Sequence, residues 1–291
     1  MNWFKLSKYS NRPIKKLQHL VVLVIFFATS LNINFASAHE KKLLLRIAVA
    51  SNFTPVLKEL LGQFESASNI NTQLITGSTG ALYLQLKHGA PFDIFLAGDV
   101  NRAQQLERDN LIVKDSRVTY ATGQLALFSK SVTLTIDDLK TPSGRFAIAN
   151  PDTAPYGKAA QQALIHLGVW PLYKNNLVTG INVNQTFTQL RSQAVERGII
   201  AYSLLVFHQL EGTLIPANYY EPIEQQLVIM KNSQNIEAAR ELSKFLLSNE
   251  VQKHLSTKGY LSQSSLNQSG SSNLGLSKVN KTKNNKEGNN G

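Results

Sequence analysis

The sequence predicts an α/β fold built mostly of parallel sheets. Short apolar runs of strand length alternate along the chain with longer runs whose apolar residues recur at helical spacing. Strands that alternate with helices tend to pair in parallel, because each helix carries the chain back to the same edge of the sheet. About 225 residues lie between the two chain ends described below, which is enough for one large or two small domains.

Seven apolar runs are the expected strands. Each is short and rich in leucine, isoleucine, valine, phenylalanine or alanine, as expected for strands buried on both faces. In chain order they are residues 43–50, 72–76, 92–97, 124–129, 146–150, 198–205 and 225–230.

The runs between them read as helices. Residues 54–68 place Val56, Leu57, Leu60, Leu61 and Phe64 on one helical face, with Thr54 as the expected cap and Pro55 in the first turn. A second helix has Pro155 near its start and Gly168 after its end. The last expected helices span residues 235–248 and 249–260.

Both chain ends are expected to lie outside the fold. Residues 1–38 combine five basic residues, the 12-residue apolar stretch LVVLVIFFATSL and the sequence ASA at 36–38, a pattern typical of an export signal cleaved after Ala38. The alternative is a transmembrane anchor, which needs a longer apolar span of about 20 residues. Residues 264–291 are polar and rich in serine and asparagine, so we expect a disordered tail to which no role can be assigned.

Cysteine content and charge narrow the class of protein. The chain contains no cysteine, so it forms no disulfide and carries no lipid-bearing cysteine, and together with the export signal this indicates a periplasmic location. Five of the 30 basic residues lie in the expected signal, and four lysines and one glutamate lie in the tail. About +3 of the formal charge of +11 therefore remains on residues 39–263, which argues against nucleic acid as a partner.

Four turns of similar chemistry follow strands and precede helices. They contain Ser51-Asn52, Ser78-Thr79, residues 150–156, and the segment Asn182-Val183-Asn184. In open α/β sheets ligands bind beyond the carboxyl ends of the strands, where such turns lie, and helix N-termini favour anions. No arginine lies at the tip of these turns and only Lys158 is cationic. Neutral hydroxyl and backbone N–H donors suit a small ionised tetrahedral oxyanion.

Other kinds of site find less support. Asp93 and Asp99 are separated by six positions, about 20 Å along an extended strand, so they do not form an acid–base pair and Asp99 is expected to cap a helix. The histidines lack the paired spacing of zinc sites, and no cation site is expected. The turn GSTG fits neither the nucleophile elbow of hydrolases nor a phosphate-binding loop.

Four sequence blocks lie within residues 43–258: RIAVASNFTPVLKEL, GSTGALYLQLKHGAPFDIFLAGD, AIANPDTAPYGKAAQQAL and the region VNQTF…RGIIAYS. In sequence and in order they resemble blocks of the periplasmic molybdate-binding proteins, the substrate-binding components of molybdate ABC transporters. The resemblance implies a type II periplasmic binding fold with two lobes, a ligand cleft and a two-strand hinge. Residues 39–121 and 222–263 would form lobe 1, and residues 122–221 would form lobe 2.

The resemblance also implies the ligand residues. Hydroxyl and side-chain donors fall on Ser51, Asn52, Ser78 and Thr79, and backbone donors fall on Tyr156 and Val183. Some members of the family add a tyrosine hydroxyl from a following strand. Here that position is Ala201, with Tyr202 one residue later, so Tyr202 is interpreted as a core residue and the missing donor is assigned to Asn184 or to the Tyr156 side chain.

The expected function is capture of molybdate, and of tungstate, by an exported monomer that delivers it to a membrane permease, without enzymatic activity or cofactor. Three alternatives stay open. The first is a binding protein for another oxyanion such as sulfate, thiosulfate or phosphate. The second is an exported hydrolase, and the third is an adhesion or assembly factor that acts through the basic tail.

Overall fold

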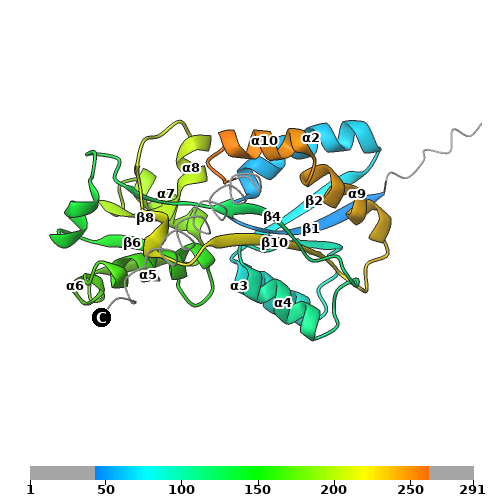
Figure 1. Cartoon of the computed structure of the whole chain (residues 1–291), viewed down its shortest axis with the longest axis horizontal. Helices are drawn as coiled ribbons and strands as arrows, with labels where there is room; N and C mark the ends of the chain where they lie inside the picture. The colour runs from blue at the N-terminus through cyan, green and yellow to red at the C-terminus, as the bar shows by residue number, and fades with distance from the viewer. Residues whose placement is uncertain (1–42, 262–291) are drawn as a thin grey trace, which may run out of the picture. The chain divides into compact units, whose positions relative to one another are not determined.

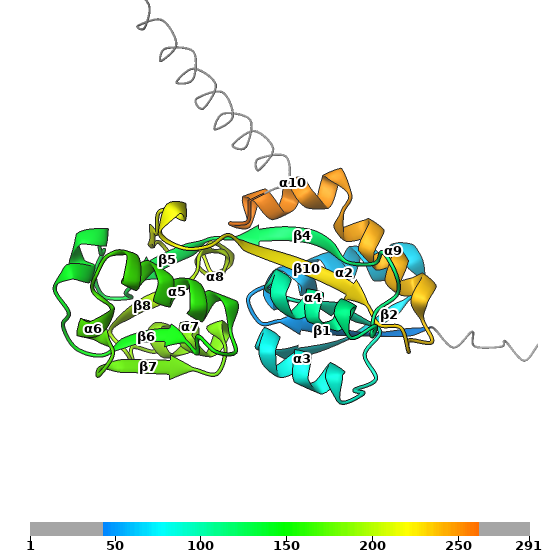
Figure 2. The same ribbon diagram turned by 60° about the horizontal axis from the view of Figure 1, so that its bottom comes forward.

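Two five-stranded sheets organise the chain. The computed structural model describes residues 43–261. The first sheet has the strand order β2-β1-β3-β10-β4 and the second has the order β7-β6-β8-β5-β9 (Figures 1 and 2). The strands of the first sheet are β1 (Leu44–Ala50), β2 (Asn71–Gly77), β3 (Ile94–Leu96), β4 (Val118–Gly123) and β10 (Ile223–Ile229). Those of the second are β5 (Leu125–Phe128), β6 (Phe146–Ala149), β7 (Leu177–Gly180), β8 (Arg197–Ala201) and β9 (Thr213–Leu214).

We call the first sheet and its helices lobe 1, and the second sheet and its helices lobe 2. Lobe 1 contains α2 (Thr54–Ser68), α3 (Thr79–Lys87), α4 (Val100–Arg108), α9 (Ile236–Leu246) and α10 (Asn249–Thr257). Lobe 2 contains α5 (Pro155–His166), α6 (Trp170–Tyr173), α7 (Val183–Arg191), α8 (Tyr202–Phe207) and the 3₁₀ turns η1 (Ile136–Lys140) and η2 (Ala217–Tyr219). Residues 43–261 all fall within one compact unit.

Helices cover both faces of the first sheet (Figure 1). Alternate residues of a strand point to opposite faces, and β1 follows this rule. Its residues Leu45, Ile47 and Val49 pack with α2, α9 and α10, whereas Ala48 packs with α3 and α4. In the second sheet, β5, β6 and β8 form a single core with α5 and α7. Each lobe therefore has a core of its own, and helix N-termini such as those of α3 and α5 lie at strand carboxyl ends.

The strand pairing corrects the expectation of mostly parallel sheets. Each sheet has two parallel and two antiparallel pairings. Strands β4 and β5 belong to different sheets, and only Gln124 lies between them. The chain thus changes sheets without a helix, and β5 and β10 run antiparallel to their neighbours.

Strands β4 and β10 pair with each other and connect the lobes, side by side in both views (Figures 1 and 2). Their ladder joins Gly123 to Ile223 at one end and contains a register shift at Gln225 and Gln226. The pair corresponds to the expected two-strand hinge. The lobe boundaries at 121/122 and 221/222 stay predictions.

Several expected element boundaries were wrong. The run 198–205 is a strand only to Ala201, after which α8 begins at Tyr202. Strands β4, β7 and β9 were not expected; all three are sheet edges, and each contains threonine or glycine instead of a continuous apolar run. Thr54 does not cap α2, because its hydroxyl instead lies 3.2 Å from the Thr76 hydroxyl on β2.

No helix within residues 43–261 is long and apolar enough to cross a membrane. The expected export signal with cleavage after Ala38 and the expected tail at 264–291 lie outside the described residues.

Candidate functional site

The four predicted turns meet at one pocket between the lobes. The space between its lining atoms is about 190 Å³, with the open solvent at its mouth included. Six of the seven predicted site residues line it: Ser51, Asn52, Ser78, Thr79, Tyr156 and Val183. The remaining lining residues are Ala50, Gly77, Ala154 and Pro155. Asn184, the second residue of α7, is not among them, so its proposed role as an extra donor lacks a contact.

The turn after β1 brings two side chains to the pocket. The Ser51 backbone N–H donates to the Gly77 carbonyl oxygen at 3.0 Å, which ties this turn to the end of β2. The Ser51 hydroxyl has no hydrogen-bond partner within residues 43–261, although the residue is only 3% exposed. A buried hydroxyl beside a pocket is therefore left to donate to a ligand.

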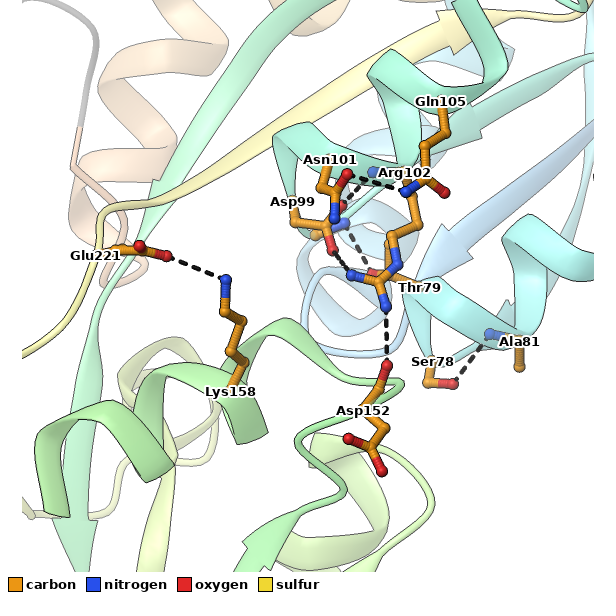
Figure 3. Close-up of polar contacts among 11 residues, drawn as sticks. Ser78, Thr79, Ala81, Asp99, Asn101, Arg102, Gln105, Asp152, Lys158 and Glu221 are labelled. Atoms are coloured by element: carbon orange, nitrogen blue, oxygen red, sulfur yellow. Dashed lines mark hydrogen bonds and ion pairs between the residues drawn. The ribbon is translucent and has the colours of Figure 1, made fainter. Parts of the chain in front are cut away.

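The turn after β2 contributes two hydroxyls that already accept hydrogen bonds. Ser78 caps α3 by accepting from the Ala81 N–H at 3.3 Å, and Thr79 Oγ1 accepts from the Gly98 N–H at 3.0 Å (Figure 3). A hydroxyl that accepts such a bond keeps its own hydrogen for another acceptor. Both side chains are thus oriented by lobe 1 itself and remain able to donate.

Lobe 2 contributes helix N-termini. Tyr156 is the second residue of α5 and Val183 is the first residue of α7, and the backbone N–H groups of a first helical turn have no acceptor within the helix. The Asn182 side chain caps α7 by accepting from the Gln185 N–H at 2.9 Å. Two helices therefore direct unpaired donors and the positive ends of their dipoles toward the pocket.

A buried polar cluster lies directly behind the pocket and joins both lobes. Gln225 Oε1 accepts from Asn52 Nδ2 at 2.8 Å and from the Tyr120 hydroxyl at 3.1 Å. Gln225 Nε2 donates to the Tyr156 hydroxyl at 3.2 Å, and the Tyr260 hydroxyl donates to the Asn52 carbonyl oxygen at 3.0 Å. Burial raises the pKa of Tyr120, Tyr156 and Tyr260 above the ordinary tyrosine value, so all three stay neutral.

This cluster holds the Tyr156 side chain, one of the two candidates for the extra donor. The Tyr156 hydroxyl lies against the backbone of β4, where a Cβ on Gly123 would come within 2.0 Å of it. Its hydroxyl accepts from Gln225 Nε2 at 3.2 Å, which places the side chain in the cluster, while its backbone N–H borders the pocket. The assignment of the extra donor to the Tyr156 side chain stays a prediction. Gln225, Tyr120 and Tyr260 were not predicted. The available signal was the polar run Glu224-Gln225-Gln226 within a strand whose other residues are apolar.

Neither Ala201 nor Tyr202 lines the pocket. Ala201 ends β8, and Tyr202 packs against the core of lobe 2 while its N–H donates to the Gln124 carbonyl oxygen at 2.9 Å. The interpretation of Tyr202 as a core residue agrees with this packing, although the residue begins a helix rather than continuing the strand.

The charged groups lie beside the pocket rather than in it. Asp99 caps α4 as expected, accepting from the Arg102 N–H at 2.8 Å, and burial raises its pKa. Arg102 and Lys158 line a neighbouring hollow, where Lys158 pairs with Glu221 at 3.1 Å (Figure 3). Tyr156 is the one pocket-lining residue whose side chain can titrate, and it stays neutral because burial raises its pKa. The pocket lining is therefore neutral.

No group of three or more histidine, aspartate or glutamate side chains that could hold a metal ion occurs within residues 43–261.

Comparison with known families places the chain. The model of the bacterial extracellular solute-binding proteins matches residues 45–261. The chain belongs to this family. A molybdate-binding protein of Azotobacter vinelandii is 34% identical over 225 residues, which cover 74% of this chain and 89% of the relative. A molybdate-binding protein of Rhodobacter capsulatus is 32% identical over 221 residues, which cover 74% and 87%.

A solved structure supports the same placement. The periplasmic molybdate-binding protein of Azotobacter vinelandii superimposes with a TM-score of 0.71 at 31% identity, covering 75% of this chain and 98% of that one. The resemblance to molybdate-binding proteins and the two-lobed periplasmic binding fold are thereby confirmed. This solute-binding protein is a binding component of transport, as its relatives are, and not an enzyme.

Proposed function

We propose that the protein captures molybdate, and also tungstate, in the pocket between its lobes. The observation that supports this most is the neutral set of donors that four turns direct to one point: the hydroxyls of Ser51, Ser78 and Thr79 and the backbone N–H groups of Tyr156 and Val183. The choice of molybdate as the anion is supported by the two relatives named molybdate-binding protein.

Binding free energy would come from donors removed from water and from helix dipoles. A tetrahedral dianion offers an acceptor at every oxygen, so each pocket donor finds a partner once water is excluded. Discrimination against smaller anions would come from the fixed spacing of these donors. In this proposal molybdate is a transported ligand and not a cofactor.

We further propose that the protein acts in the periplasm after cleavage at Ala38, as a monomer that delivers its anion to an ABC permease. The sequence pattern of residues 1–38 and the periplasmic relative support the location. Binding of sulfate, thiosulfate or phosphate is the competing reading, since these anions accept the same hydrogen bonds.

Calorimetric titration tests the ligand. The purified protein is titrated with molybdate, tungstate, sulfate and phosphate in one buffer. We expect one-to-one binding of molybdate and tungstate and no heat from the other two. Heat from sulfate or phosphate alone would keep the fold and overturn the ligand, and no heat from any anion would reject the proposal.

A further inference from the structure

Two contacts from lobe 1 converge on a single loop of lobe 2. The loop is residues 150–154, which leads from β6 into α5. The Gly80 N–H donates to the Thr153 carbonyl oxygen at 2.9 Å. The Arg102 guanidinium Nη2 donates to the Asp152 carbonyl oxygen at 2.8 Å, and Figure 3 shows its side chain reaching down to this loop. Neither donor lines the anion pocket.

The loop is arranged to offer these carbonyls. Its own N–H groups bond inward: the Asp152 N–H donates to Asn150 Oδ1 at 2.9 Å, and the Thr153 and Ala154 N–H groups donate to the Asn150 carbonyl oxygen. The carbonyl groups of Asp152 and Thr153 accept from the other lobe instead. Tyr156, whose backbone N–H borders the pocket, lies two positions after Ala154, the last residue of the loop.

The backbone conformation of Gly80 does not require glycine. It lies in the first turn of α3 and is not among the positive-φ residues of the structure. A Cβ built on it would come within 3.1 Å of both the Cα and the carbonyl oxygen of Thr153. The missing side chain therefore matters across the cleft, where it allows two backbones to approach each other.

Arg102 is held ready for the same loop. Its guanidinium Nη1 lies 3.4 Å from Asp99 Oδ2, and Asp99 in turn caps the helix that carries Arg102. A charged donor to a carbonyl gives a stronger bond than a neutral donor. Because these contacts join the two lobes, they exist only when the lobes are together.

We propose that Gly80 and Arg102 form a closure latch that slows release of the bound anion without touching it. The inference rests on the proposed function, since it assigns these residues to the same binding event. Contacts made only in the closed state shift the open–closed equilibrium toward closure, and the apparent affinity rises with the closed fraction.

The variant Gly80→Ala tests the steric half of the latch. Alanine favours a helix over glycine, so we expect an unchanged or raised Tm without ligand, together with a molybdate Kd raised about 10-fold through faster release. Gly62→Ala is the matched control, because Gly62 lies in α2 with nothing within 4 Å of the added Cβ. It should gain the same helix stability and bind as the parent protein does.

The variant Arg102→Ala tests the charged half. We expect a release rate raised on the order of 10-fold with a nearly unchanged association rate, and a smaller effect for Arg102→Lys. Arg240→Ala is the control, because Arg240 also pairs with an acidic residue three positions earlier, Glu237, but on α9. A loss confined to the association rate and abolished by salt would identify long-range attraction and overturn the latch.

Both rates are measured by exchange of radiolabelled molybdate. If the parent protein binds no oxyanion, the proposed function fails before the latch is tested, and small-angle scattering of the parent, Gly80→Ala and Arg102→Ala proteins still reports whether either variant opens the lobes. If the parent binds and both variants release at the parent rate, the latch is wrong and the proposed function stands.

Discussion

The Thr79 hydroxyl can accept one hydrogen bond within the protein and donate another to a ligand. Thr79 Oγ1 accepts from the Gly98 N–H, which fixes the side chain, and its hydrogen remains for an anion. Ser51 is simpler, because its hydroxyl has no partner within residues 43–261 while its backbone N–H is bonded to Gly77. Thr79 therefore presents an oriented donor, and Ser51 presents a hydroxyl that is free to turn toward a ligand.

Removal of either hydroxyl should weaken binding. We expect Ser51→Ala and Thr79→Ala each to weaken molybdate binding by about 1–3 kcal/mol, roughly 5- to 150-fold, because a buried anion oxygen loses its donor. Thr79→Ser should restore most of the affinity. Thr188→Ala is a control, since that hydroxyl donates to the Asn184 carbonyl oxygen on the exposed side of α7. Titration calorimetry measures all four variants, and unchanged affinity in both Ser51→Ala and Thr79→Ala would show that the anion binds elsewhere.

At the scale of elements, the site depends on the short distance between the first turn of a helix and the end of the strand before it. Gly157, the third residue of α5, shows this, because a Cβ on it would come within 2.1 Å of the Ala149 carbonyl oxygen at the end of β6. The helix can start this near the sheet only without that side chain, and its first-turn N–H groups are placed accordingly.

The variant Gly157→Ala should therefore displace α5 from β6. We expect a loss of roughly 1–3 kcal/mol of folding free energy from overpacking against backbone, and weaker anion binding as the Tyr156 N–H moves. Thermal unfolding with and without molybdate measures both effects. A variant that keeps the parent Tm and affinity would contradict this account of the helix start.

Local sequence also explains which elements could be predicted. Central strands such as β1 and β6 are mostly apolar runs and were expected, whereas the edge strands β4, β7 and β9 carry threonine or glycine and were not. The cap assigned to Thr54 failed because the hydroxyl found a partner on the neighbouring strand β2, which helix-end statistics do not include.

Over the whole molecule, Gln225 couples the lobes. From the hinge strand β10 its side chain binds Asn52 of lobe 1 and Tyr156 of lobe 2, so the two halves of the pocket share one buried amide. Burial raises the pKa of Tyr156, and no other residue that lines the pocket titrates. Binding should therefore be independent of pH from about pH 6 to 9.

The variant Gln225→Glu should make binding depend on pH. A protonated glutamate keeps one acceptor and one donor, as the amide does, whereas its carboxylate cannot donate to Tyr156 and repels a nearby anion. Affinity of the variant should fall as pH rises through the pKa of the new carboxyl, while the parent stays flat. Titrations across this pH range at constant ionic strength measure both, and a sloping parent or a flat variant would contradict the role given to Gln225.

The sequence by itself determined the alternation of strands and helices, the family resemblance, and the hydroxyls and helix starts that line the pocket, because turn chemistry and helix caps depend on neighbours in the chain. Only the tertiary structure decided which donors are already engaged. The Gly80 N–H donates to the Thr153 carbonyl oxygen, and Gln225 Nε2 donates to the Tyr156 hydroxyl, contacts between residues about 70 positions apart. Such pairings follow from how the two lobes pack, and no local pattern of residues encodes them.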